Sequence, residues 1–148
     1  MTHHRDHLPL VYSCSGCSSA AQLANHLAIQ LDRAGLAEMS CIAGVGGGVP
    51  SLVRKAREAQ AAGRPIMALD GCALACVKAC LESREVQASV HVQLQRLGVR
   101  KVYHEGFVPD QAGALFDRLA AQALELATRP EGEAAKGCGG RSGCACAS

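Results

Sequence analysis

Four short apolar segments along the chain predict β-strands. Three of them, at 8–13 (LPLVYS), 37–45 (AEMSCIAGV) and 64–70 (RPIMALD), are nearly continuous apolar runs, which is typical of strands buried on both faces. The fourth, at 88–98 (ASVHVQLQRLG), alternates apolar and polar residues. Because side chains of a strand point to opposite faces in turn, we expect this last strand to have one exposed face.

Helical periodicity follows each of these segments. In 18–35, the residues Leu23, Leu27 and Leu31 fall on one stripe, and Gly35 provides a stop. The other predicted helices are 46–63, which opens near Pro50, then 72–85 and 109–129. Strands that alternate with helices predict an α/β fold, a single-domain three-layer sandwich with a mostly parallel four-stranded sheet and helices on both faces.

The pattern is lost at both ends of the chain. We expect residues 1–7 to be a flexible N-terminus and residues 8–129 to form the α/β domain. After Pro130 the sequence is rich in Gly, Ser and Ala without apolar periodicity, so 130–148 is predicted to be a disordered tail. Three cysteines of this tail cannot be core residues and are possible accessory thiols: Cys138, Cys144 and Cys146.

Composition and charge exclude several kinds of partner. A net charge of +2, an aromatic content of 3% and the lack of Trp argue against nucleic-acid binding. No apolar run approaches the roughly 18 residues of a membrane span, and the N-terminus does not resemble a signal peptide. We therefore expect a cytoplasmic protein, in which nine cysteines stay reduced and serve metal binding or redox chemistry.

The predicted strand ends bring cysteines together. Functional groups of a parallel sheet collect at the carboxyl ends of its strands. Cys14 ends the first predicted strand, Cys41 lies near the end of the second, and Cys72 follows the third by two residues. Cys17 belongs to the same CSGC segment as Cys14, and Cys76 lies one helical turn after Cys72. Five sulfurs in one small volume would suit zinc or an iron–sulfur cluster.

The stretch LDGCALACVKAC (69–80) adds detail to this site. Asp70 is a good N-cap residue, and Gly71 permits a tight turn from strand to helix. A helix that starts near Cys72 would stabilise the thiolate form, which is the form that ligates metal. Cys80 would lie about 12 Å from Cys72 along that helix, too far to share one ion, so we expect Cys80 to be a packing residue.

Three segments resemble the DGC-domain family, to which zinc binding is attributed and which is named for an Asp-Gly-Cys motif. They are CSGCSSAAQLANHLAIQLDRAG, MSCIAGVGGGVPSLVRKA and ALDGCALACVKACLE, and the resemblance spans roughly residues 8–107. It implies four metal ligands, at Cys14, Cys41, Cys72 and Cys76, with Cys17 as a fifth thiol found in part of the family. Neither Cys80 nor the cysteines of the tail acquire a role from the resemblance.

Two functions are compatible with these thiols. Four thiolates close the coordination shell of zinc, which predicts a structural or metal-handling role rather than an enzyme. The alternative is a thiol redox or sulfur-transfer protein that uses the Cys14/Cys17 pair or Cys72 as nucleophile. In either case the tail could exchange metal or sulfur with a partner protein, which the sequence does not identify.

The glycine-rich segment GVGGGVP (44–50) lacks the residues of a nucleotide-binding loop. No Gly-Lys-Ser/Thr follows it, and Val49 stands where a GxGxxG pattern needs its last glycine. We interpret it as a flexible turn, and a small anionic ligand at the following helix start is the alternative.

Overall fold

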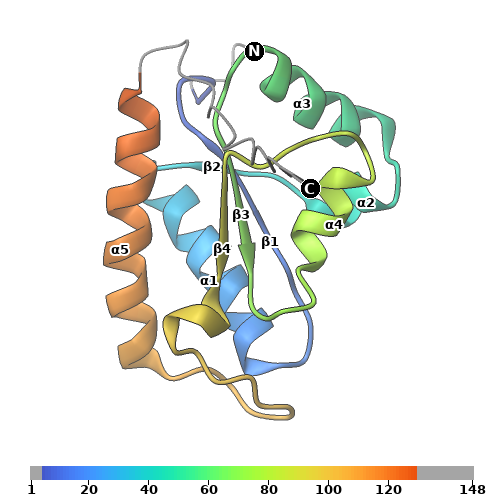
Figure 1. The fold of residues 1–148 in the computed structure, drawn as a ribbon. Coiled ribbons are helices and arrows are strands. Elements are labelled where there is room, and N and C mark those ends of the chain that lie inside the picture. Colours follow the sequence, from blue (N-terminus) through green and yellow to red (C-terminus); the bar gives the residue numbers. More distant parts are fainter. Residues whose placement is uncertain (1–4, 130–148) are drawn as a thin grey trace, which may run out of the picture.

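A computed structural model describes residues 5–129 and shows a four-stranded parallel sheet between two layers of helices (Figure 1). The strand order is β2-β1-β3-β4. This confirms the predicted single-domain α/β sandwich. The elements in chain order are β1 (Leu10–Ser13), α1 (Ser19–Arg33), β2 (Glu38–Met39), α2 (Ile42–Gly46), α3 (Pro50–Ala61), β3 (Ile66–Asp70), α4 (Cys76–Glu82), β4 (Val90–Gln93), the 3-10 helix η1 (Leu94–Leu97) and α5 (Pro109–Thr128).

Each face of the sheet packs against its own set of helices. Helices α1 and α5 cover one face, and α2, α3 and α4 cover the other (Figure 1). Val11 and Met67 point toward α1 and α5, whereas Tyr12 and Ala68, their neighbours in sequence, point toward the opposite layer. The central strands β1 and β3 are therefore buried at every position, which explains their continuous apolar runs.

The predicted helix at 18–35 is confirmed as α1. Its three leucines, Leu23, Leu27 and Leu31, are fully buried against the sheet. The Ser18 hydroxyl caps the first turn by accepting a hydrogen bond from the Ala21 N–H at 3.2 Å. Gly35 follows the helix with φ +69, a left-handed conformation that favours glycine.

The prediction of a strand over 37–45 is wrong beyond its first residues. Strand β2 comprises only Glu38–Met39, and Ile42–Gly46 form the short helix α2. A short apolar run cannot distinguish a strand from a buried helical turn by its periodicity alone. Here the helical turn carries Val45 into the core beside Tyr12, so Cys41 is the N-cap residue of α2 and not part of a strand.

The prediction that a helix begins near Cys72 is also wrong. The chain makes a turn after β3, and α4 begins only at Cys76, after Ala75 in a left-handed conformation with φ 51. Ala75 is therefore the N-cap residue, and Asp70 is not. The carboxylate of Asp70 nevertheless caps this helix from outside, as described below.

The fourth predicted strand is shorter than expected. Strand β4 ends at Gln93, and η1 replaces the rest of the segment. Its predicted alternation is confirmed, because Val92 is buried while His91 on the opposite face is exposed.

Both predicted chain ends extend past the described residues. Residues 1–4 and the predicted tail, with Cys138, Cys144 and Cys146, lie outside them. Among residues 5–129, no helix is long and apolar enough to cross a bilayer.

Candidate functional site

The cysteines near β1 and β3 lie at the point where the topology of the sheet changes direction. The two strands are neighbours, yet α1 after β1 packs on one face and α4 after β3 packs on the other. Connections that diverge in this way open a crevice at the carboxyl ends of the strands, where α/β proteins bind their ligands. Cys14 follows β1 directly, and Gly71 and Cys72 follow β3, so both segments lie at this switch point of the sheet.

Cys14 is held by the end of β3 through both its backbone and its side chain. Its N–H donates to the Leu69 carbonyl at 3.0 Å, and its Sγ accepts a hydrogen bond from the Gly71 N–H at 3.1 Å. Burial raises the pKa of the Cys14 thiol to about 11, which the Gly71 N–H only partly opposes, and the charges of Asp70, Cys76 and Cys72 add to the rise. Cys14 is therefore a neutral thiol near pH 7, and Cys72 and Cys76 lie within electrostatic reach of it.

This raised pKa predicts a loss of stability in alkali. The thiol has an ordinary pKa of 9.0, so above pH 9 the unfolded chain loses its proton before the folded chain does. Stability is then fully present below pH 9 and falls between pH 9 and about 11. The loss is at most about 2.7 kcal/mol, at ~1.4 kcal/mol per pKa unit, and is smaller for a thiol that water partly reaches. Urea unfolding of the chelator-treated protein at several pH values would measure this loss of stability.

The pKa of Tyr12 is raised as well, so the comparison needs a variant. Burial also raises the pKa of Tyr12, which weakens the fold in alkali in the same direction. The Cys14→Ala variant should therefore lose less stability than the wild type between pH 8.5 and pH 11. Equal losses in the two proteins would show that the Cys14 thiol ionises in the folded chain as readily as in the unfolded one.

Gly71 is required by the close approach of helix α1. A Cβ at this position would lie 2.6 to 2.8 Å from the backbone C and O of Ala20 and the N of Ala21. Real Cβ atoms do not approach backbone atoms so closely, and backbone cannot move aside as a flexible side chain can. The glycine thus allows the first turn of α1 to pack directly on the strand end that carries Cys72.

Asp70 joins three elements around the site. Its side chain is almost fully buried, and its carboxylate accepts hydrogen bonds from the N–H groups of Val77 at 2.8 Å and Lys78 at 3.3 Å. His91 Nε2 of β4 lies 2.8 Å from the second carboxylate oxygen. Asp70 therefore fixes the start of α4, which carries Cys76, relative to both β3 and β4.

Sequence reasoning did not connect His91 with Asp70, although a signal existed. His91 is paired with Ala68 in the parallel register of β3 and β4, and Asp70 lies two residues after Ala68 on the same face. Period-two alternation therefore places His91 near Asp70 once the register is known.

Lys101 lies beside Cys72 and was also missed. Its Nζ is 3.4 Å from Cys72 Sγ and 5.2 Å from the centre of the Tyr103 ring. Interaction with Tyr103 first, and with Cys72 second, raises the pKa of Lys101, so its ammonium keeps its charge. A cation in this position stabilises negative charge on the sulfur. Lys101 lies in a loop without periodicity, so no pattern in the sequence could have indicated it.

Three of the predicted metal ligands are exposed, and one of them is Cys76, at the start of α4. Cys17 is exposed in the loop before α1, and Cys41 is exposed at the start of α2. Cys80 packs against α2, because a Cβ on Gly46 would lie 2.7 Å from its sulfur, and burial raises the pKa of its thiol. This contact fits the packing role expected for Cys80.

The described cysteines are free thiols without a completed metal shell. Within residues 5–129, no three Cys, His, Asp or Glu side chains lie close enough together to hold an ion as they stand. Cys14, Cys72 and Cys76 are close enough to feel one another's charge, and their donor chemistry fits a soft metal ion. Closing a shell around an ion would require their side chains to rotate toward a common point.

Comparison with known proteins decides the family. The DGC-domain family matches the chain over residues 10–119, which includes every element from β1 to most of α5. This chain belongs to the DGC-domain family. Its Asp-Gly-Cys motif is Asp70, Gly71 and Cys72, so the motif for which the family is named spans the end of β3 and the turn after it, at the switch point of the sheet.

A DGC-domain protein of this kind has a close curated relative. The chain is 60% identical over 114 residues to the "Anaerobic and virulence modulator AnvM" of Pseudomonas aeruginosa (strain PAO1). The alignment covers 77% of this chain and 84% of the relative. No solved structure matches the chain.

Proposed function

We propose that this DGC-domain protein binds a soft metal ion, with zinc as the first choice, through the thiolates of Cys14, Cys72 and Cys76. The observation that carries the proposal is the neighbourhood of Cys14. Its partly buried sulfur accepts a hydrogen bond from the Gly71 N–H and lies within electrostatic reach of both other thiols. Cys41 is the fourth ligand that the family resemblance implies, and Cys17 is the fifth thiol near the site.

The electrostatics of these residues favour a cation. Three thiolates and the Asp70 carboxylate would repel one another in a partly buried crevice, and this repulsion contributes to the raised pKa of Cys14. A bound divalent ion reverses this balance, because it stabilises thiolate and releases the protons. The Gly71 N–H supports a thiolate at Cys14 as an outer hydrogen-bond donor, and Asp70 fixes the helix start that carries Cys76.

Elemental analysis of the full chain tests the proposal directly. We expect protein purified anaerobically without chelator to contain about one zinc per chain, and the Cys14→Ser and Cys72→Ser variants to contain almost none. Cys80→Ser is the matched control, since the Cys80 sulfur packs against Gly46 and should not hold the ion. Deleting residues 131–148 in a further variant determines whether the cysteines of the tail hold metal of their own.

Two outcomes would contradict the metal proposal. The first is a metal content near zero in the wild-type protein. The second is the same zinc content in Cys14→Ser, Cys72→Ser and Cys80→Ser. If the protein is brown and contains iron, an iron–sulfur cluster replaces zinc as the cofactor, and the same variants test its ligands.

A thiol redox or sulfur-transfer function is the second candidate, and Lys101 is the observation that favours it. An ammonium 3.4 Å from the partly exposed Cys72 sulfur is typical of a thiol activated as a nucleophile. The AnvM relative is named for anaerobic modulation, and thiolates are oxidised when oxygen is present. Alkylation separates the candidates: bound metal protects Cys72 until a chelator removes it, whereas a redox thiol reacts at once.

The cellular setting is part of this proposal. We place the protein in the cytoplasm, where reduced thiols can hold metal, and its partner would be a protein that exchanges metal or sulfur with the C-terminal tail.

A further inference from the structure

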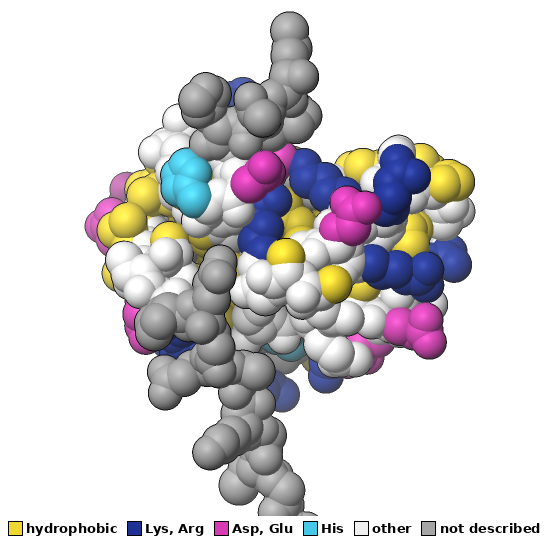
Figure 2. Space-filling view, turned by 90° about the horizontal axis from the view of Figure 1, so that it is seen from above, with side chains coloured by type: hydrophobic (Ala, Val, Ile, Leu, Met, Phe, Trp, Pro, Cys, Tyr) yellow, Lys and Arg dark blue, Asp and Glu magenta, His cyan; other side chains and the backbone are white. Residues whose placement is uncertain are grey.

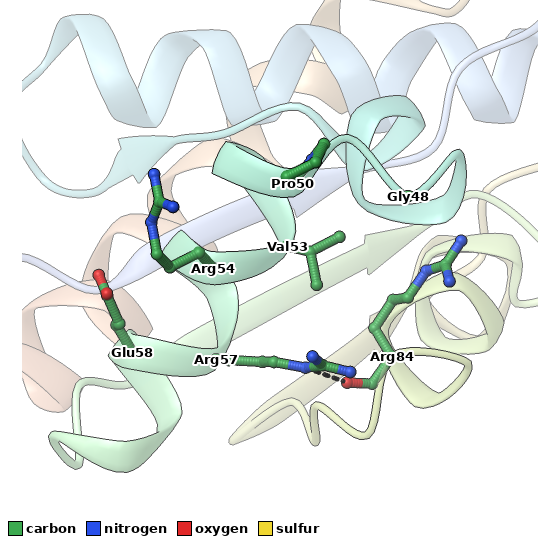
Figure 3. Close-up of a pocket in the computed structure, with 7 residues that line it drawn as sticks. All are labelled: Gly48, Pro50, Val53, Arg54, Arg57, Glu58 and Arg84. Carbon is green, nitrogen blue, oxygen red and sulfur yellow. Dashed lines mark hydrogen bonds between the residues drawn. The ribbon is translucent and has the colours of Figure 1, made fainter.

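A second site lies away from the thiols, in a hollow between α3 and the end of α4 (Figure 3). The hollow has a volume of about 380 Å³. Its lining residues come from the turn before α3, from α3 itself and from the residues after α4: Gly48, Pro50, Val53, Arg54, Arg57, Glu58 and Arg84. Three arginines and one glutamate thus line the hollow, with Arg54 and Glu58 on one side and Arg84 on the other (Figure 3).

Arg84 is fixed in this hollow by backbone carbonyls, and no carboxylate among residues 5–129 pairs with it. Its Nε donates to the Val45 carbonyl at 3.0 Å and its Nη2 to the Gly46 carbonyl at 2.7 Å. Gly48, with φ +78, leaves room for this side chain, since a Cβ there would lie 3.0 Å from Nη2. The Nη1 group donates to no atom of residues 5–129, so the positive charge of Arg84 is held rigidly in place and uncompensated.

The other two arginines add to this charge. Arg57 donates from Nε to the Arg84 carbonyl at 3.1 Å, shown by the dashed line in Figure 3, and pairs only loosely with the exposed Glu85 at 3.5 Å. Arg54 makes no ion pair with a residue of the described chain, and Glu58 also pairs with none of the three. Figure 2, which views the molecule from above, shows that Lys and Arg side chains gather over α3.

Two N–H groups of the glycine-rich turn are not free to donate to the small anion that the sequence suggested near the start of α3. The Gly48 N–H donates to the Val45 carbonyl and the Val49 N–H to the Gly44 carbonyl, so these groups are already used in the turn. Recognition in this hollow therefore depends on arginine side chains. The planar fork of a guanidinium suits phosphate and carboxylate groups, to which it can donate two parallel hydrogen bonds.

We propose that this hollow binds a small molecule through a multiply charged oxyanion group, a phosphate or a dicarboxylate, held by Arg54, Arg57 and Arg84. Its volume exceeds that of a single phosphate group, and Val53 offers an apolar contact for the rest of the ligand (Figure 3). The site is separate from the thiols of the proposed metal centre, so its test does not depend on metal binding.

Thermal unfolding of the full-length protein in three titrations tests the site. The probes are sodium phosphate, sodium succinate and sodium chloride at matched ionic strength, and a ligand that binds the folded state raises the unfolding temperature with its concentration. We expect phosphate or succinate to give a larger rise than chloride. The active probe identifies whether the oxyanion is a phosphate or a carboxylate.

Charge variants localise the effect. Arg54→Gln should weaken the apparent Kd about two- to fivefold, as expected for one lost exposed ion pair, and Glu58→Gln should strengthen it by a similar factor. Arg118→Gln, on the exposed side of α5, is the matched control and should change nothing. The proposal is overturned if neither probe exceeds chloride, or if Arg54→Gln and Arg118→Gln respond alike.

Discussion

Replacing Gly71 by alanine is expected to destabilise the fold by about 3 kcal/mol or more, at the upper end of the cost of forcing an extra methyl into a packed site. The reason is that the new Cβ would meet only backbone atoms, those of Ala20 and Ala21 at 2.6 to 2.8 Å. The first turn of α1 would have to move away from the end of β3. Urea unfolding of the metal-free protein measures the change in the free energy of unfolding.

Gly113→Ala provides the matched control for this glycine. Gly113 lies within α5, and a Cβ there meets nothing within 4 Å, so alanine should stabilise the helix by about 0.5 to 1 kcal/mol. The two substitutions are chemically identical, yet they should change the free energy of unfolding in opposite directions. A loss of less than about 1 kcal/mol in Gly71→Ala would mean that α1 adjusts easily, and the packing argument would fail.

The Asp70→Asn variant is expected to lose about 2 to 4 kcal/mol of stability, because a buried acceptor of three hydrogen bonds becomes in part a donor. The carboxylate accepts from Val77 N and Lys78 N and lies 2.8 Å from His91 Nε2. An asparagine has only one oxygen, so its NH2 group must face either the Val77 N–H, or the Lys78 N–H and His91 Nε2 that share the other carboxylate oxygen. Urea unfolding again measures the loss.

The His91→Gln variant separates the two contacts of Asp70. His91 is partly exposed, so its replacement should cost only about 1 kcal/mol, the net contribution of a typical hydrogen bond. Asp70→Asn would also weaken the cap at the start of α4, which positions Cys76. If Asp70→Asn were no more destabilising than His91→Gln, the carboxylate would not be holding the helix.

The sequence predicted the architecture well, because the core imposes a clear pattern. Leu23, Leu27 and Leu31 repeat with the helical period, and the two central strands are apolar at every position because both faces are covered. The strand order and the parallel register could not be read from these patterns. The pairing of His91 with Asp70 depends on that register, so it became visible only in the structure.

The predicted site was least accurate at its turns. The spacing of the cysteines suggested a helix from Cys72 onward, but Ala75 adopts a left-handed conformation and delays the helix to Cys76. Asp70 caps that helix from the end of β3, which a rule about neighbouring N-cap residues cannot detect. Likewise, Ile42 and Val45 have the three-residue spacing of a helical turn, but in a short apolar run a strand buried on both faces has no periodicity that would exclude it.

The hydrogen bond between Gly71 and Cys14 has a practical consequence for spectroscopy. Because this N–H points at the sulfur from 3.1 Å, its proton is sensitive to the electron density on that atom. The amide resonance of a single glycine can therefore report by NMR whether Cys14 carries a proton, a metal ion or an oxygen atom, with no probe attached to the protein.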